Sequence, residues 1–265
     1  MSSVQIIANA TIVTCDVSLN VIYDGALAVS GSTIAAVGST ESVLKAFPAA
    51  NLVDGKGKAV FPGLINCHSH STSLFNRGIS DDFGFPSSYR FPVPVTSMAS
   101  DDDLNVIVGL SAVEAIRSGS TTVVEIGTNV ANYAGTLATS GLRWVLAESV
   151  SDGIVQQGYL PGEPVWDYSE ERREQEMARA YALFEGWNET YDGRINCIAS
   201  AQLVETSSPS LLSDVKDLAS RYNTMYTIHL SQSPIEVESL LEMRGARPTQ
   251  SLFINEFLGP KLLAA

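Results

Sequence analysis

The sequence contains only three histidines, and two of them, His68 and His70, are separated by a single residue. They follow the apolar segment 60–67, which predicts a strand. Side chains at positions i and i+2 of a strand point to the same side, and two neutral imidazoles on one face can chelate a metal ion. The spacing therefore predicts a metal-binding pair at the end of a strand. A bare H-x-H is also compatible with two polar residues that begin a loop.

The chain after residue 60 alternates between apolar segments and segments with helical spacing. Strands are expected at residues 61–67, 121–126, 143–149, 196–201 and 225–229. Helices are expected at residues 101–117, 132–140, 169–187, 210–222, 234–243 and 253–258. This alternation predicts parallel βαβ units, either in an open doubly wound sheet or in the first five strands of a (β/α)8 barrel. No G-x-G-x-x-G follows the first strand, which argues against a dinucleotide-binding sheet.

Residues 1–60 have a different pattern, rich in β-branched residues and glycine-containing turns. Residues 26–30 and 33–37 flank a glycine and predict a hairpin. We therefore expect two domains, a small β unit over residues 1–60 and a larger α/β unit over residues 61–265.

Further polar residues fall where the predicted strands end. Glu125 lies in the second strand, Glu148 in the third, and His229, the third histidine, ends the fifth. Catalytic groups at the C-terminal ends of several strands are typical of a barrel. A single histidine is more often a hydrogen-bonded core residue, but here all three can meet at one rim. Three imidazoles are a common catalytic zinc set, and zinc lowers the pKa of its water to about 7.

Composition narrows the class of partner. The net charge of −13 argues against nucleic acid or an anionic membrane, since both need clustered basic residues. The three cysteines form no disulfide framework and no zinc pattern, and we expect free thiols in the cytoplasm, with Cys67 in the core. No apolar run approaches a membrane span, and no secretory signal begins the chain.

Several segments together resemble the amidohydrolase superfamily, closest to its branch of deaminases, chlorohydrolases and carbamate or urea hydrolases. The matching pieces are the P-G-x-x-x-x-H-x-H block at residues 62–70 and the segments 25–29, 34–38, 53–58, 77–78, 118–123, 229–232 and 259–265. The resemblance implies a (β/α)8 TIM-like barrel, of which this chain carries the first five strands, preceded by a small β-sandwich portion. It also implies a homo-oligomer of the complete unit.

The same resemblance implies that His68, His70 and His229 are metal ligands. Family branches with two metals usually place a carboxylated lysine on the fourth strand, and residues 196–201 contain none. The expectation is therefore one divalent metal ion, with zinc favoured and iron, cobalt or manganese compatible with the ligands.

This sequence departs from the family at Gln232, where the branch usually carries a proton-shuttling glutamate. An amide cannot exchange protons at neutral pH, so Gln232 is expected to orient substrate or water. The main expectation is a hydrolase of C–N bonds in a small, neutral amide, urea or carbamate, with metal-bound hydroxide as nucleophile. The alternatives are an aminohydrolase or dechlorinase of a heterocycle, and an inactive incomplete paralogue that serves as a partner subunit.

The family's fourth histidine and its catalytic aspartate would follow residue 265. The sequence therefore predicts that the C-terminal remainder of the barrel comes from elsewhere, for instance from a separate chain. The aromatic loop from Phe83 to Phe91 is a candidate lining for an apolar substrate pocket, or equally a loop packed on the rim.

Overall fold

The structure is a computed structural model that describes residues 4–78, 98–156 and 158–265. The aromatic loop from Phe83 to Phe91 lies outside these described residues. The chain divides into two compact units, Met1–Gly63 and Leu64–Ala265, and each is considered by itself.

The first unit is a five-stranded sheet with one helix. Its elements are β1 (Val4–Val13), β2 (Val21–Ser30), β3 (Thr33–Ser39), α1 (Thr40–Ala46), β4 (Asn51–Asp54) and β5 (Ala59–Val60). The strand order is β3-β2-β1-β4, and β5 also pairs with β1. The antiparallel pair β2 and β3 confirms the predicted hairpin. Alternate strand residues such as Ile6, Ala8 and Ala28 pack with Val43 of α1, so one face of the sheet is buried by the helix.

The second unit is built on a parallel sheet. Its strands are β6 (Leu64–Ser69), β7 (Ser120–Gly127), β8 (Arg143–Val150), β9 (Ile195–Cys197), β10 (Ala199–Leu203), β11 (Tyr226–His229) and β12 (Leu262–Ala264). Its helices are η1 (Ser71–Asn76), α2 (Asp101–Arg117), η5 (Val130–Asn132), α3 (Ala134–Thr139), α4 (Glu170–Trp187), α5 (Thr190–Gly193), α6 (Pro209–Arg221), α7 (Pro234–Arg244) and α8 (Pro248–Ile254).

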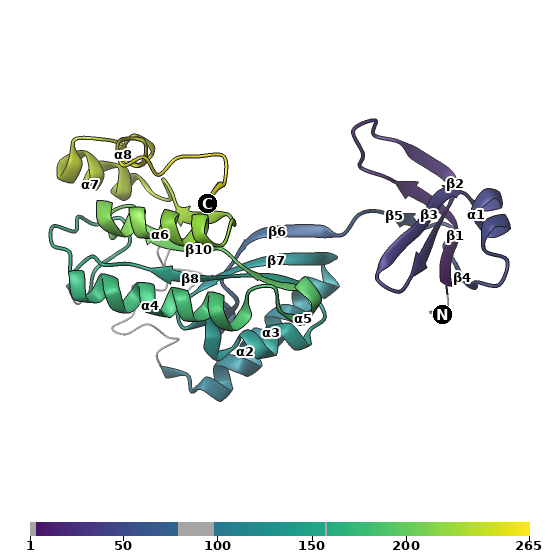
Figure 1. Ribbon diagram of the computed structural model, residues 1–265, viewed down its shortest axis with the longest axis horizontal. Coiled ribbons are helices and arrows are strands. Elements are labelled where there is room, and N and C mark those ends of the chain that lie inside the picture. Colours follow the sequence, from purple (N-terminus) through teal and green to yellow (C-terminus); the bar gives the residue numbers. More distant parts are fainter. Residues whose placement is uncertain (1–3, 79–97, 157) are drawn as a thin grey trace. The chain divides into compact units, whose positions relative to one another are not determined.

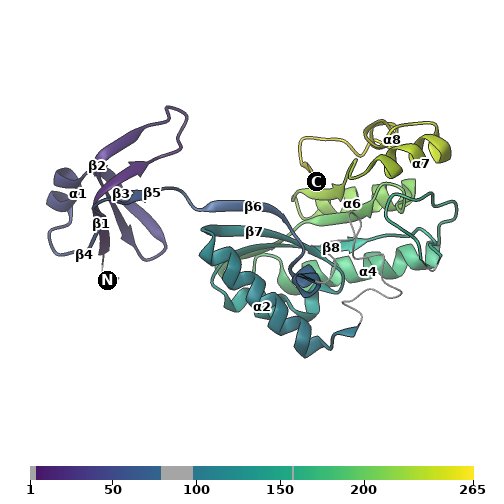
Figure 2. The same ribbon diagram turned by 180° about the vertical axis from the view of Figure 1, so that it is seen from behind.

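The strand order of this sheet is β12-β11-β10-β8-β7-β6, with β9 also paired to β8. Apart from the short β9, neighbouring strands of the sheet follow one another in the sequence, and every pair is parallel. An open doubly wound sheet reverses its strand order at a switch point, whereas a barrel does not. The described part of the sheet thus has the topology of a (β/α)8 barrel. Figure 2 shows β6, β7 and β8 running side by side, with α2 next to them.

The structure differs from the sequence-based expectation near the end of the chain. The helix predicted over residues 253–258 is wrong, because α8 ends at Ile254. Pro248 occupies its first turn, where proline is well tolerated, and Glu256 beyond its end has a φ of 54°, which no right-handed helix allows. Phe257 is instead fully buried, with its ring against Tyr226. A sixth parallel strand, β12, follows and pairs with β11.

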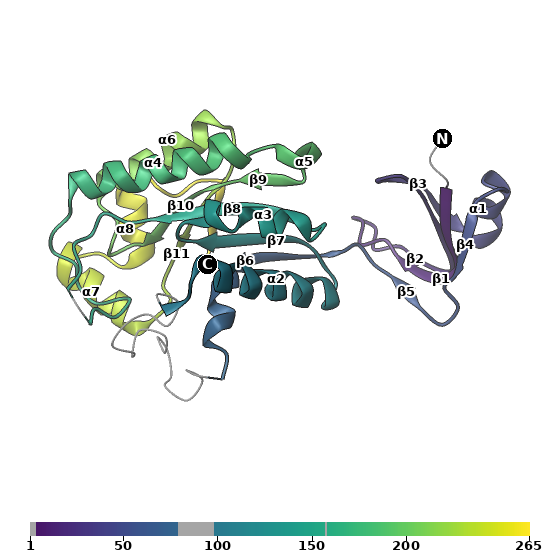
Figure 3. The ribbon, with the colours of Figure 1, turned by 90° about the horizontal axis from the view of Figure 1, so that it is seen from below.

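The helices cover one face of the parallel sheet and form the main core. α4 and α6 run side by side along it (Figures 1 and 3). Trp144 and Leu146 of β8 are buried there against Leu183 of α4 and Leu212 of α6. The alternate strand residues face the other side and form a second, smaller cluster: Val124, Ile126, Ala147 and Ile198. Both faces of the central strands are thus apolar, as a parallel sheet requires.

Serine caps begin the principal helices of this unit. Ser100, Ser169, Ser208 and Ser233 each accept a hydrogen bond from a backbone N–H of the following first turn. Such a cap satisfies one of the N–H groups that the helix itself leaves unpaired. These caps set where α2, α4, α6 and α7 start, and hence the length of each loop at the C-terminal ends of the strands.

The expected core position of Cys67 is wrong, since this residue is exposed. It lies on β6, the outermost strand of the described sheet, and its neighbours Leu64 and Ile65 are 60% and 65% exposed. Residues 64–67 of β6 are all exposed, so the described elements of the second unit leave this part of the strand uncovered. Among the described residues, no helix has the length and apolar character needed to cross a membrane.

Candidate metal centre

The three histidines meet at the C-terminal rim of the parallel sheet. His68 lies near the end of β6, His70 directly follows that strand, and His229 is the last residue of β11. The Nε2 atom of His70 is 3.0 Å from Nε2 of His68 and 3.1 Å from Nε2 of His229. Residues 159 positions apart in the sequence are therefore brought into one cluster, as the strand ends predicted.

Backbone carbonyls fix the tautomer of two of these rings. Nδ1 of His70 lies 2.7 Å from the carbonyl oxygen of Ile126, and Nδ1 of His229 lies 2.7 Å from that of Gln202. A carbonyl oxygen only accepts hydrogen bonds, so each Nδ1 carries the proton and donates it. In the neutral rings, Nε2 is then left with a free lone pair that points into the cluster.

The surroundings of two of the three rings favour their neutral form. Burial, followed by the neighbouring His70 and His229, lowers the pKa of His68 from 6.5 to about 4. Burial is also the largest cause that lowers the pKa of His229, which the bond to Gln202 partly opposes. Both rings are therefore unprotonated at pH 7 and can act as ligands, since a metal binds only the neutral imidazole.

These donors suit a metal ion. Among the described residues, the three histidines are the group of side chains whose ligand atoms all lie within 4.8 Å of one another. Two nitrogens of a tetrahedral zinc site, each about 2.05 Å from the ion, are about 3.3 Å apart, close to the separations seen here. The bonds from His70 and His229 to carbonyl groups are the outer contacts typical of metal-ligating histidines. Nδ1 of His68 is buried without a partner in the described ranges.

Glu125 lies directly behind this cluster but is not part of it. Its carboxylate accepts hydrogen bonds from the backbone N–H of Ser71 (2.9 and 3.0 Å), from the Ser71 hydroxyl (2.6 Å) and from the Tyr133 hydroxyl (3.2 Å). Burial outweighs these bonds and raises the pKa of Glu125 to about 7. Because Ser71 follows His70 in the chain, Glu125 fixes the backbone at the point where that ligand leaves the strand.

Glu148 has a similar structural role in the next loop. Its two carboxylate oxygens accept the backbone N–H groups of Asn129 and Val130, at 2.7 and 2.9 Å. Arg179 pairs with it from α4, at 3.3 Å. Neither Glu125 nor Glu148 belongs to the described group that could share a metal ion. Their carboxylates hold loops and are therefore not positioned as replacements for the family's glutamate.

Gln232 follows His229 by three residues, on the loop that leads into α7. Its side-chain nitrogen Nε2 is buried and has no hydrogen-bond partner within the described residues. A buried amide donor without a partner is costly, by about 1–3 kcal/mol, and is unusual in a folded protein. This N–H therefore remains without a hydrogen-bond acceptor among the described residues.

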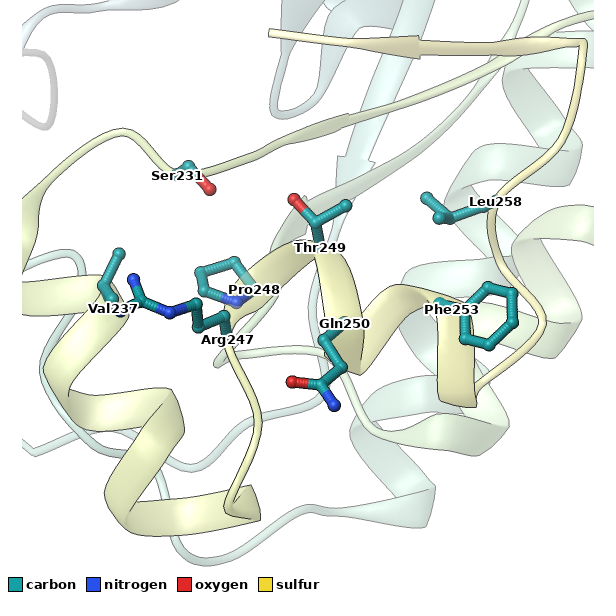
Figure 4. Close-up of a pocket in the computed structure, with 8 residues that line it drawn as sticks. All are labelled: Ser231, Val237, Arg247, Pro248, Thr249, Gln250, Phe253 and Leu258. Atoms are coloured by element: carbon teal, nitrogen blue, oxygen red, sulfur yellow. The ribbon is translucent and has the colours of Figure 1, made fainter.

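A cavity of about 490 Å³ lies beside the same loop. Figure 4 shows Arg247 and Val237 towards one end of it and Phe253 and Leu258 towards the other. Ser231, Pro248, Thr249 and Gln250 complete its lining. None of the three histidines lines this cavity, so it is distinct from the metal centre.

Sequence reasoning did not identify the groups that orient the ligands. Two of these are the backbone carbonyls of Ile126 and Gln202, which no side-chain pattern can reveal. Glu236 was also missed: its carboxylate accepts the N–H groups of Ser231 and Gln232 and so holds the loop after His229. The S-x-x-E sequence from Ser233 to Glu236 was visible, but it indicates a helix start and not a contact with the preceding loop.

Comparison with known proteins agrees with this architecture. Residues 59–253 match the profile of the Amidohydrolase family, and residues 25–50 match the imidazolonepropionase-like composite domain of bacteria. A 5'-deoxyadenosine deaminase from Methanobrevibacter smithii is 33% identical over 215 residues, which covers 81% of this chain and 46% of that protein. A 5-methylthioadenosine/S-adenosylhomocysteine deaminase from Syntrophobacter fumaroxidans is 31% identical over 260 residues, covering 98% and 56%.

A solved structure shares the fold. The zinc-bound adenosine deaminase from Xanthomonas campestris superposes with a TM-score of 0.76 at 22% identity, covering 99% of this chain and 57% of that one. The chain spans about half the length of the curated relatives it matches. The family match extends over most of the chain, from the strand before the paired histidines to α8. We conclude that this chain belongs to the amidohydrolase family.

Proposed function

We propose that this chain carries the metal-binding half of an aminohydrolase that removes an exocyclic amino group from a purine-like heterocycle. The observation that carries the proposal is the convergence of three imidazole Nε2 atoms, 3.0 and 3.1 Å apart, at the C-terminal rim of the sheet. The named relatives that act on adenosine-type compounds support a heterocyclic substrate over the simple amide, urea or carbamate of our main sequence-based expectation.

The chain's own residues would hold one divalent metal ion through His68, His70 and His229, with zinc as the favoured ion. A bound zinc ion supplies Lewis acidity and brings the pKa of a water molecule close to about 7. The carbonyl groups of Ile126 and Gln202 keep the second nitrogen of two rings protonated, so that both rings present Nε2 to the ion.

Gln232 would orient the substrate through its free N–H. This group can donate to an unprotonated ring nitrogen or to a carbonyl oxygen, but it cannot supply a proton to a leaving amine. Deamination therefore requires that another group protonates the leaving nitrogen. The sequence resemblance assigns the general base to an aspartate beyond Ala265, in the remainder of the barrel.

A second candidate function follows from Gln232 itself. Chloride leaves a heterocyclic carbon as a stable anion and needs no proton. A dechlorinating hydrolase would thus tolerate glutamine at this position better than a deaminase would. The two candidates share the metal centre and differ in the product that is released.

We also propose that the complete unit is a closed (β/α)8 barrel with an N-terminal β-sandwich portion, in which β6 and β12 pair with strands supplied by the remainder of the barrel. Both are edge strands of the described sheet, and exposed edges are usually paired or covered. A cytoplasmic homo-oligomer of this complete unit is the proposed form, and the three unpaired cysteines support a reducing compartment.

The test is a product assay with the zinc-loaded complete unit, in which this chain is assembled with the remainder of the barrel. We expect ammonia release from 5'-deoxyadenosine or 5-methylthioadenosine, and no chloride release from a chlorinated triazine. Chloride without ammonia would favour the dechlorinase. A protein that binds no transition metal and releases neither product would instead support an inactive partner subunit.

A further inference from the structure

The loop after His229 is held by a buried carboxylate. Glu236, in the first turn of α7, is only 1% exposed. One of its oxygens accepts the N–H of Ser231 at 3.0 Å, and the other accepts the N–H of Gln232 at 2.7 Å. Its own N–H donates to the hydroxyl of Ser233. The carboxylate thus fixes two consecutive peptide units between the last histidine and the helix.

This arrangement stabilises an unusual backbone conformation. Ser231 has a φ of 58°, in the left-handed region that non-glycine residues rarely adopt. The loop after β7 repeats the combination, with Glu148 accepting the N–H groups of Asn129, at φ 56°, and of Val130. Strained residues of this kind persist only where the surroundings hold them, and they cluster at functional sites. In both loops a buried glutamate provides that restraint.

The peptide that Glu236 holds is the one that carries Gln232. The direction of a side chain follows from its backbone, and the Gln232 Nε2 group is enclosed without a partner among the described residues. We propose that Glu236 is a positioning residue: it orients the Gln232 backbone so that the carboxamide N–H meets the substrate, an inference that rests on the function proposed above. Glu236 itself does not touch the substrate.

A second loop approaches the backbone of Glu236 closely. Gly162, on the segment between β8 and α4, has a φ of 97° and lies against the start of α7. A Cβ at Gly162 would lie 2.8 Å from the backbone nitrogen of Glu236 and 3.3 Å from its Cα atom. The N–H of Gly162 in turn donates to the buried carboxylate of Glu205, at 2.7 Å. A methyl group at position 162 must therefore displace Glu236 without touching the histidines.

These contacts suggest two variants that test the role of Glu236, and a third that serves as a control. Glu236→Gln keeps the shape of the side chain, but its amide can accept only one of the two N–H groups and turns a donor towards the other. Gly162→Ala displaces the backbone of Glu236, because the added methyl group would lie too close to it. Gly141→Ala is the matched control, because Gly141 has a similar positive φ of 84° and nothing within 4 Å of the added carbon. All three are compared by their kcat/KM for 5'-deoxyadenosine.

We expect Glu236→Gln and Gly162→Ala to lower kcat/KM by about 10- to 100-fold, as small misplacements of a substrate-orienting group do. Gly141→Ala should stay within about twofold of wild type. In a Gln232→Ala background, Glu236→Gln should add no more than about a twofold loss, because both changes remove the same contact. Independent, multiplying losses would overturn the proposal.

A measurement without substrate separates this inference from the proposed function. The heteronuclear NOE of the Gln232 side-chain amide, measured by NMR on the 265-residue chain, reports how firmly that group is held. We expect it to fall in Glu236→Gln and Gly162→Ala towards the value of the exposed Gln250, and to be unchanged in Gly141→Ala. An unchanged NOE in Glu236→Gln would overturn the role of Glu236. Absence of ammonia release by wild type would instead overturn the proposed function.

Discussion

The buried carboxyl of Glu125 should make the stability of this protein depend on pH in a defined direction. Glu125 is fully buried, and desolvation raises its pKa from 4.5 to about 7 in the folded chain. A carboxyl whose folded pKa lies above its unfolded value favours the protonated state on folding. Its contribution to stability is therefore complete below pH 4.5 and is lost as the pH rises through about 7.

The size of this effect follows from the two pKa values. The interval between 4.5 and about 7, at 1.36 kcal/mol per pH unit, corresponds to roughly 3 kcal/mol of unfolding free energy. Glu125→Gln removes the titration and keeps the shape of the side chain. Relative to this variant, wild type should thus lose most of roughly 3 kcal/mol between pH 5 and pH 8.

Urea unfolding of both proteins at a series of pH values measures the difference. Glu114→Gln is the control, since Arg77 holds the pKa of the exposed Glu114 below its ordinary value. Any pH effect of that carboxylate must therefore run in the opposite direction. If wild type and Glu125→Gln kept a constant stability difference from pH 5 to pH 8, Glu125 would be ionised throughout. The bonds from Ser71 and Tyr133 would then outweigh desolvation, and our reasoning would be refuted.

Three further predictions concern the metal centre and the core. His229→Ala removes one of the three converging imidazoles. The zinc that the protein retains after gel filtration, measured by atomic emission, should therefore fall to a small fraction of the wild-type content. An equal zinc content would contradict the ligand assignment. Gln232→Glu restores an acid that exchanges protons, and ammonia release should rise by roughly 100-fold, whereas an unchanged rate would show that another group already serves. Leu183→Ala in the core should lower the free energy of unfolding in urea by about 2–5 kcal/mol. Phe253→Ala, at a side chain that is 70% exposed, should lower it by less than about 0.5 kcal/mol. Equal losses would contradict the assigned core.

The paired histidines were predictable because a strand imposes a period of two on its side chains. His68 and His70 needed no long-range information to share a face, and their Nε2 atoms are indeed 3.0 Å apart. His229 was placed with them because parallel strands end at one rim. The elements around them followed from periodicity, with an error at residues 253–258, where α8 ends at Ile254.

The sequence of β6 alone could not show whether Cys67 is buried or exposed. Alternation places it opposite the histidines, but whether that side is covered depends on which elements pack there. β6 is an edge strand among the described residues, and its outer side remains exposed. Edge and centre are properties of the assembled sheet, so the local sequence contains no sign of the difference.

Residue types and local periodicity determined the architecture of this protein, which consists of parallel βαβ units with histidines at the strand ends. Only the tertiary structure decided how that site is held. The carbonyl oxygens of Ile126 and Gln202 select the tautomers of two of the histidines, and the carboxylates of Glu125 and Glu236 hold peptide units in the loops that follow them. Backbone acceptors carry no signature in the sequence. The role of Glu125 becomes visible only when folding brings Ser71, 54 residues away, within hydrogen-bonding distance.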